Sequence, residues 1–233
     1  MLQKNDRQRL HRIREAYDLT VEQYDRQIEP FSVLPKEFFL SKDFQLFLQT
    51  MHNEQVNSGN PAIQSFLKPE PGQKYLDAGC GANLANYRLY TWPSIYFGID
   101  LSPKLIQVMQ QFTRNFKIKI GGLCNGEISH LPYEDNSFDL ATVIGVFEYY
   151  SPEYAKAVFS EIKRVLKPGA KLVFDVPNQE HHLFTIMKKT EQFLNRPIVF
   201  EMTESFENLI RENFELDHRE DSKVMTGYFV HKT

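Results

Sequence analysis

The sequence has few cysteines, no long hydrophobic run and no surplus of basic charge. Its two cysteines among 233 residues, Cys80 and Cys124, are far apart, so we expect neither a disulfide framework nor a cysteine-based metal site. The longest apolar run, around residues 141–147, is far shorter than the ~20 residues that a membrane-spanning helix needs. With 27 Lys and Arg against 30 Asp and Glu, the net charge of −3 argues against a protein that coats duplex DNA.

An apolar signal-peptide core is also missing, because residues 1–7 read MLQKNDR. Together with the few cysteines, this pattern predicts a cytoplasmic protein without a membrane span. Hydrophobic residues make up 42% of the chain and charged residues 24%, as in ordinary globular proteins. A chain of this length and composition is expected to form one domain with an appended element, and to bury a core without metal or disulfide support.

The first 70 residues have the pattern of helices. Apolar side chains recur every three or four positions between residues 10 and 28, and again between residues 40 and 51. Thr20 and Gln23 match a capping box, which predicts a break of the first helix near residue 20. The segment KPEPG at residues 68–72 marks a boundary. We therefore expect a helical cap over residues 1–70 and a second domain over residues 71–233.

Strand-like and helical segments alternate from residue 74 onward. We expect strands over residues 75–78, 95–100, 116–120, 140–147 and 171–176, and helices that begin at residues 82, 103 and 152. This alternation predicts an α/β fold with a doubly wound, mostly parallel sheet. A helix near residues 203–213 is followed by two strand-like segments, over residues 214–220 and 228–231. These two segments predict an antiparallel hairpin at the edge of the sheet.

A glycine-containing loop, DAGCGAN at residues 77–83, follows the first expected strand. Ligands of doubly wound sheets bind at the carboxyl ends of the strands, and glycines let the backbone approach them closely. A dinucleotide fingerprint fails because Leu84 stands at the third glycine position. Asp100, at the end of the second strand, can accept two ribose hydroxyls, and Asp77 can pair with an ammonium group. Since Asp77 would repel a pyrophosphate, these charges favour S-adenosylmethionine over NAD.

Residues 74–178 resemble the class I S-adenosylmethionine-dependent methyltransferases, especially the small-molecule group that includes quinone-biosynthesis enzymes. Four segments carry the resemblance in the right order: residues 75–81, 97–102, 126–139 and 164–170. Two positions depart from the family pattern. Asn83 stands where a third glycine is frequent, and Glu127 stands where aspartate is usual. Asn83 tolerates a left-handed backbone, and Glu127 keeps the negative charge on a longer side chain.

The resemblance implies a Rossmann-like sheet of seven strands with an antiparallel last strand, and S-adenosylmethionine as the cofactor, with S-adenosylhomocysteine as its product. It implies cofactor contacts by Asp77, Ala78, Gly79, Gly81, Asp100, Leu101, Glu127, Ile128, Gly145 and Val146. In this interpretation Asp77 lies at the methionine half, Asp100 at the ribose and Glu127 beside the adenine. Gly145 and Val146 lie under the sulfonium.

Three further side chains are candidates for the site. Tyr24, together with Tyr17 and Asp25, is similar to an amino-terminal Tyr-Asp pattern that covers the cofactor in many relatives, although packing along the helix explains these residues equally well. A hydroxyl or ammonium acceptor must lose a proton, which requires a base. The candidate bases are His130, Glu148, Tyr149, His181 and His182, of which we select Glu148, after the fourth strand, and His181, after the fifth. The alternatives are a solvated carboxylate and a loop histidine. No metal-ligand set is expected.

These observations predict an enzyme that methylates O, N or C of a small molecule, as a monomer or homodimer. Two alternatives remain open: a non-catalytic module that binds S-adenosylmethionine, and a nucleic-acid or protein methyltransferase. Amino-directed DNA methylation would place an Asn/Asp-Pro-Pro-Tyr/Phe motif after the fourth strand, where residues 145–148 read GVFE. We therefore expect no DNA partner.

Overall fold

The computed structural model describes residues 4–29, 31–56 and 61–233, and its described part contains one seven-stranded sheet in the order β3-β2-β1-β4-β5-β7-β6. The strands are β1 (Lys74–Ala78), β2 (Ile95–Asp100), β3 (Gly122–Asn125), β4 (Phe138–Val143), β5 (Leu166–Pro177), β6 (Glu215–Glu220) and β7 (Met225–His231). The first five are parallel, and β7 lies antiparallel between β5 and β6. This order confirms the predicted fold class and the terminal hairpin.

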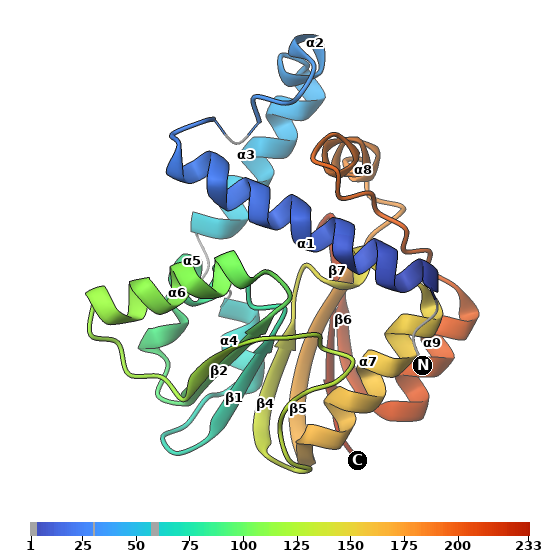
Figure 1. The fold of residues 1–233 in the computed structure, drawn as a ribbon. Coiled ribbons are helices and arrows are strands. Elements are labelled where there is room, and N and C mark those ends of the chain that lie inside the picture. The colour runs from blue at the N-terminus through green and yellow to red at the C-terminus, as the bar shows by residue number, and fades with distance from the viewer. Residues whose placement is uncertain (1–3, 30, 57–60) are drawn as a thin grey trace.

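Both faces of the sheet are buried, because successive side chains of its central strands enter different hydrophobic clusters. Leu76 packs with helices α7 (Pro152–Val165) and α9 (Glu204–Asn213), which lie side by side in Figure 1. Tyr75 instead packs with α4 (Pro61–Leu67) and α6 (Pro103–Asn115). Strands buried on both faces are typical of parallel sheets covered by crossover helices.

The amino-terminal helices cover the carboxyl ends of the strands. Helix α1 (Lys4–Asp25) runs across this edge in Figure 1, with α2 (Lys36–Phe39), α3 (Lys42–Val56) and α8 (Phe184–Phe193) beyond it. Several contacts attach α1 to the loops at this edge; among them, the Ser102 hydroxyl donates to Asp18 at 2.5 Å, and the Ser151 hydroxyl donates to Asp6 at 3.0 Å. Helix α1 thereby joins the loop after β2 to the loop after β4.

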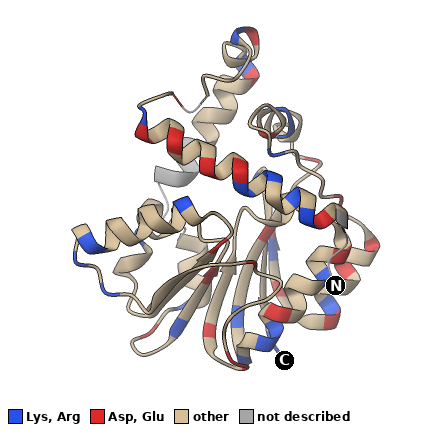
Figure 2. Cartoon of the chain, viewed as in Figure 1, with Lys and Arg blue, Asp and Glu red and all other residues tan. Residues whose placement is uncertain are grey.

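Figure 2 shows charges of both signs on α1, with most basic residues in its amino-terminal half and most acidic residues in its carboxyl-terminal half. No helix in the described parts of the chain combines the length and the apolar character that crossing a bilayer requires.

Several predicted boundaries are wrong. Helix α1 is unbroken, because the Thr20 hydroxyl donates to the Ala16 carbonyl instead of capping a new helix. The third strand is β3 rather than residues 116–120, where Phe116 ends α6 and is 68% exposed. Residues 116–120 alternate in hydrophobicity but form a turn and then a segment without strand pairing. Strand β4 ends at Val143, and residues 147–149 form a 3-10 turn.

The predicted helix at residues 82–90 is divided into two short pieces. Helix α5 (Asn83–Asn86) and the 3-10 helix η1 (Leu89–Thr91) are separated at Arg88, whose φ is +51°. Helices α6, α7 and α9 begin within one or two residues of the predicted positions. Ser102 and Ser151 each accept the N–H three residues on, and a proline follows each of them at the first helical position.

Candidate functional site

A cavity of about 620 Å³ lies at the carboxyl ends of β1, β2 and β4, beneath α1. We call it the large cavity. Eight of the side chains and glycines that the resemblance pointed to line it: Gly79, Gly81, Asp100, Leu101, Glu127, Ile128, Gly145 and Val146. They come from the ends of four strands, and they meet because parallel strands present their carboxyl ends at one edge.

The glycine loop brings its backbone close to the loop after β4. Gly79 has φ +80°, and a Cβ there would lie 2.3 Å from Cγ2 of Val146. Gly81 has φ +45°, and a Cβ there would meet no atom within 4 Å. Gly79 therefore permits a close approach of two loops, whereas Gly81 leaves the backbone open toward the large cavity.

Asp100 is fixed at the end of β2 by two backbone donors. Its Oδ2 accepts the N–H of Gly81 and its Oδ1 accepts the N–H of Ser102, each at 2.8 Å. Burial raises the pKa of Asp100, and these two N–H groups oppose the rise. A carboxylate oxygen has more than one acceptor position, so the carboxylate retains capacity for two hydroxyls of a ribose.

Asp77 and Ala78 lie behind the glycine loop and do not line the large cavity. The Asp77 carboxylate accepts the hydroxyls of Tyr96 at 2.9 Å and Thr142 at 3.0 Å, and the amide of Asn83 at 3.4 Å. Burial raises the pKa of Asp77 to about 6 against these three donors. A cation bound at the glycine loop would favour its ionised form.

The loop after β3 presents Glu127 to the large cavity. Its Oε1 accepts the hydroxyls of Ser129 at 2.6 Å and Tyr154 at 3.0 Å. These two hydrogen bonds fix the orientation of the Glu127 side chain, which is longer than that of the aspartate usual in the family. Glu127 and the buried Ile128 both line the large cavity, so a polar and an apolar side chain lie next to each other there.

Tyr17, rather than Tyr24, reaches the large cavity from α1. Tyr24 is 78% exposed and lines no part of it. The guanidinium of Arg196 lies 4.5 Å from the centre of the Tyr17 ring and also lines the cavity. Sequence reasoning missed Arg196, because it follows α8 in a segment without a recognisable motif.

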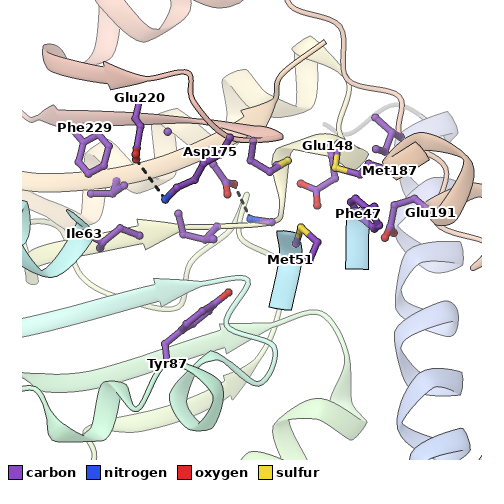
Figure 3. A pocket seen from close by; sticks show the side chains of 17 residues that line it. Phe47, Met51, Ile63, Tyr87, Glu148, Asp175, Met187, Glu191, Glu220 and Phe229 are labelled. Carbon is purple, nitrogen blue, oxygen red and sulfur yellow. Dashed lines mark hydrogen bonds and ion pairs between the residues drawn. The ribbon is translucent and has the colours of Figure 1, made fainter. Parts of the chain in front are cut away.

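A second cavity, of about 220 Å³, adjoins the first (Figure 3). We call it the small cavity. Helices α3 and α8 contribute apolar side chains such as Met51 and Met187. Tyr87, Ile144 and Gly145 line both cavities. The two spaces therefore meet at the carboxyl end of β4.

Glu148 enters the small cavity from the 3-10 turn η2 (Phe147–Tyr149). The turn is held because the N–H groups of Val199 and Phe200 donate to the Glu148 carbonyl at 2.9 and 3.1 Å. Burial raises the pKa of Glu148 well above its usual range, and the nearby carboxylates Asp175 and Glu191 raise it further.

His181 lies elsewhere. It lines a separate polar cavity with Arg219 and Asp221, so the structure does not bring it together with Glu148. Its Nδ1 accepts the N–H of Leu183 at 3.2 Å, and burial lowers the pKa of the ring. Among the residues that the structure describes, no group of three or more His, Cys, Asp or Glu side chains is placed to hold a metal ion.

Comparison with known sequences identifies the domain. Residues 76–174 match the family described as "Methyltransferase domain". A demethylmenaquinone methyltransferase of Bacillus mycoides is 34% identical over 109 residues, which are 45% of this chain and 44% of the relative. An uncharacterized protein of Methanocaldococcus jannaschii is 35% identical over 142 residues, which are 60% of this chain and 57% of the relative. The chain thus matches about half the length of these relatives.

Solved structures agree on the fold. A protein of Pyrococcus horikoshii superposes with a TM-score of 0.61 at 17% identity, over 87% of this chain and 98% of its own. A SAM-dependent methyltransferase of Methanosarcina mazei superposes with a TM-score of 0.58 at 20% identity, over 75% of this chain and 97% of its own. These structures show the fold that the chain shares with them, and the sequence match identifies residues 76–174 as a methyltransferase domain.

Proposed function

We propose that this protein transfers the methyl group of S-adenosylmethionine to a small-molecule acceptor, with the cofactor in the large cavity and the acceptor in the small one. The observation that carries the proposal is the junction of the two cavities at Tyr87, Ile144 and Gly145. Methyl transfer requires donor and acceptor atoms in line and in contact, and a junction of this kind supplies that alignment.

The residues of the large cavity fit the proposed cofactor. When bound, S-adenosylmethionine supplies an activated methyl group on a sulfonium. Asp100 would accept the ribose hydroxyls, and Glu127 would lie at the adenine. Gly81 leaves room for the methionine part, while the buried charge of Asp77 favours a cation nearby. Ile128, Leu101 and Val146 would supply apolar contacts.

The small cavity supports an acceptor of modest size. Its walls are mainly apolar, and Glu148 lies close to the shared wall, since its Oε1 lies 3.8 Å from where a Cβ on Gly145 would stand. The other carboxylate at this wall, Asp175, already accepts the N–H of Gly145 at 2.8 Å. We assign Glu148 the role of proton acceptor for the incoming nucleophile. Burial and the neighbouring carboxylates raise the pKa of Glu148, which makes its carboxylate a stronger proton acceptor than an exposed one. His181 lines another cavity, so we assign it no role in the transfer.

Residues 1–70 act in this proposal as a cap. Helix α1 supplies Ile13, Arg14, Tyr17 and Thr20 to the large cavity, and α3 supplies Phe47 and Met51 to the small one. Covering both cavities excludes water, which strengthens the electrostatic contacts within them. The remaining residues, 71–233, form the methyltransferase domain on which the cap rests.

Calorimetric titration with S-adenosylmethionine and S-adenosylhomocysteine tests the proposal. We expect micromolar binding of both, and at least tenfold weaker binding by Asp100→Ala. Asp43→Ala, which removes an exposed carboxylate from α3, is the matched control and should bind as the unaltered protein does. If the folded protein binds neither compound, the proposal is overturned.

A further inference from the structure

The small cavity combines an apolar wall with an unusual number of ionisable groups. Phe47, Met51, Met187 and Phe229 contribute apolar surface from three different elements, α3, α8 and β7. Four carboxylates and one lysine also line it: Glu148, Asp175, Glu191, Glu220 and Lys223. The formal charge of the residues that line the small cavity is therefore negative.

Two of these carboxylates already have cationic partners. Glu191 forms an ion pair with Arg196 at 2.9 Å, and Glu220 forms one with Lys223 at 3.6 Å. Figure 3 shows Glu220 paired in this way at one end of the cavity. Their charges are largely balanced within the protein, so neither demands a charged ligand.

Glu148 differs from both. It is 8% exposed, and its Oε2 is buried without a hydrogen-bond partner among the described residues. Figure 3 shows its carboxylate within the cavity between Asp175 and Met187. Asp175 adds a negative charge nearby while its Oδ1 accepts the N–H of Gly145 at 2.8 Å. Buried polar atoms are normally satisfied, so an open acceptor position beside a second carboxylate points to a ligand that donates and carries positive charge.

We propose that the acceptor is a small primary or secondary amine with an apolar body, bound as its ammonium form with Glu148 as counter-charge. This inference rests on the proposed function and specifies the class of substrate for the same cavity. An ammonium would donate to the open Oε2 of Glu148 and would place its positive charge near both carboxylates. An anionic acceptor would be repelled by both carboxylates, and a neutral alcohol would gain a hydrogen bond without the charge.

The proton balance of such a transfer closes within the site. The Glu148 carboxylate takes one N–H proton from the bound ammonium, and the freed nitrogen lone pair forms the bond to the methyl carbon. The electron pair of the broken carbon–sulfur bond stays on sulfur. The product is an N-methylated ammonium, and the proton on Glu148 passes to solvent when the cavity opens.

Three probes with closely similar aromatic bodies test the charge preference: 2-phenylethylamine, 2-phenylethanol and phenylacetate. Each is titrated calorimetrically into the full chain saturated with S-adenosylhomocysteine at pH 7.5. We expect the amine to bind at least tenfold more tightly than the alcohol, and phenylacetate to bind most weakly. With S-adenosylmethionine in place of the product, mass spectrometry should detect the N-methylated amine.

Glu148→Gln keeps the size of the side chain and removes its charge. We expect it to weaken amine binding at least tenfold and to change alcohol binding by less than twofold. Glu134→Gln makes the same change at an exposed site outside both cavities and should leave the ranking intact. Thermal unfolding of both variants shows whether they are folded. The order of affinities for the three probes is measured on the unaltered protein and therefore tests the inference even if a variant does not fold.

The inference is overturned if the alcohol or the acid binds as tightly as the amine, if Glu148→Gln keeps the preference, or if none of the probes binds at millimolar concentration. Intact binding of S-adenosylhomocysteine in those cases leaves the proposed function standing. Failure of the folded protein to bind either cofactor form would instead overturn the proposed function itself. The two failures are thus distinguished in one set of titrations.

Discussion

The hydroxyl oxygens of Tyr17 and Tyr149 lie 3.1 Å apart, although 132 positions separate the two residues in the chain. Tyr149 donates its single proton to Glu191 at 2.9 Å, so Tyr17 must be the donor of the pair. Arg196 pairs with Glu191 and stacks on the Tyr17 ring. This group of four connects α1 to both cavities, because Tyr17, Tyr149 and Arg196 line the large cavity and Glu191 lines the small one.

Tyr17→Phe should loosen the attachment of α1. The variant keeps the ring under Arg196 but leaves the Tyr149 oxygen without its donor. Since a neutral hydrogen bond contributes about 0.5–1.5 kcal/mol, we expect S-adenosylhomocysteine affinity to fall about two- to tenfold in calorimetry. Tyr90→Phe, on η1 and outside both cavities, is the matched control. An unchanged affinity for Tyr17→Phe would mean that the bond does not hold the cap over the cofactor.

Gly79→Ala should destabilise the protein more than Gly72→Ala. Both glycines have a positive φ, +80° and +87°, so both substitutions incur the cost of a left-handed backbone, about 1 kcal/mol or more. Only at Gly79 does the new Cβ meet another atom, Cγ2 of Val146 at 2.3 Å; around Gly72 nothing lies within 4 Å.

Urea unfolding of the two variants isolates the cost of the clash. We expect Gly79→Ala to lose about 1–3 kcal/mol beyond the loss of Gly72→Ala, as overpacking does in cores. Val146→Ala removes the clashing methyl, so the double variant Gly79→Ala with Val146→Ala should recover part of this excess. Equal losses at the two glycines would contradict the close approach of the loops.

The parts of the fold that local chemistry specifies were predictable from the sequence. The Ser-Pro helix starts at residues 102 and 151 and the glycine loop after β1 carry their own signals over a few residues. Asp100 was predictable as a site residue because its place at a strand end follows from the alternation of strands and helices. These features depend on sequence neighbours alone.

Other features depend on tertiary packing and left no local signal. The contact of Arg196 with Tyr17 joins residues far apart in the chain, and neither segment carries a motif for it. Strand β3 reads GLCN, which is too short to show the alternation of a strand, while the alternating residues 116–120 form a turn followed by a segment without strand pairing. Tyr24 shared the helical spacing of Tyr17, yet only the docking of α1 decides which of the two tyrosines faces the cavity.

Asp77 should make the stability of the protein depend on pH between about 4 and 6. Burial raises its pKa from 3.8 to about 6, while Tyr96, Thr142 and Asn83 lower it and Asp100 raises it. The folded state therefore holds the proton more tightly than the unfolded state. Its contribution to stability is present below pH 4 and is lost as the pH rises through 6, by about 3 kcal/mol at 1.36 kcal/mol for each pKa unit.

Asp77→Asn removes this titration while keeping the shape of the side chain. We expect the free energy of unfolding of the variant, relative to the unaltered protein, to rise by about 2–3 kcal/mol between pH 4 and pH 7.5. Urea denaturation at four pH values across this range measures the difference. A difference that stays constant with pH would show that Asp77 does not titrate in this window.

Arg164 attaches the loop that carries Glu127 to helix α7. Its guanidinium donates to both oxygens of Glu161, at 2.9 Å each, and to the Tyr133 and Leu131 carbonyls at 2.8 and 3.0 Å. A further bond reaches Asp135 at 2.8 Å. A planar fork makes these bonds simultaneously, whereas an ammonium group cannot reproduce the paired geometry.

Arg164→Lys should therefore be far from conservative. We expect a loss of about 1–3 kcal/mol in the free energy of unfolding, since at least two of these bonds are lost and two carbonyls lose a donor. The loop would also hold Glu127 less firmly, so S-adenosylhomocysteine affinity should fall severalfold in the same preparation. Arg211→Lys makes the same exchange on the exposed side of α9, where the side chain is 66% exposed, and should change neither quantity. A variant that loses stability but keeps full affinity would separate the fold of this loop from cofactor recognition.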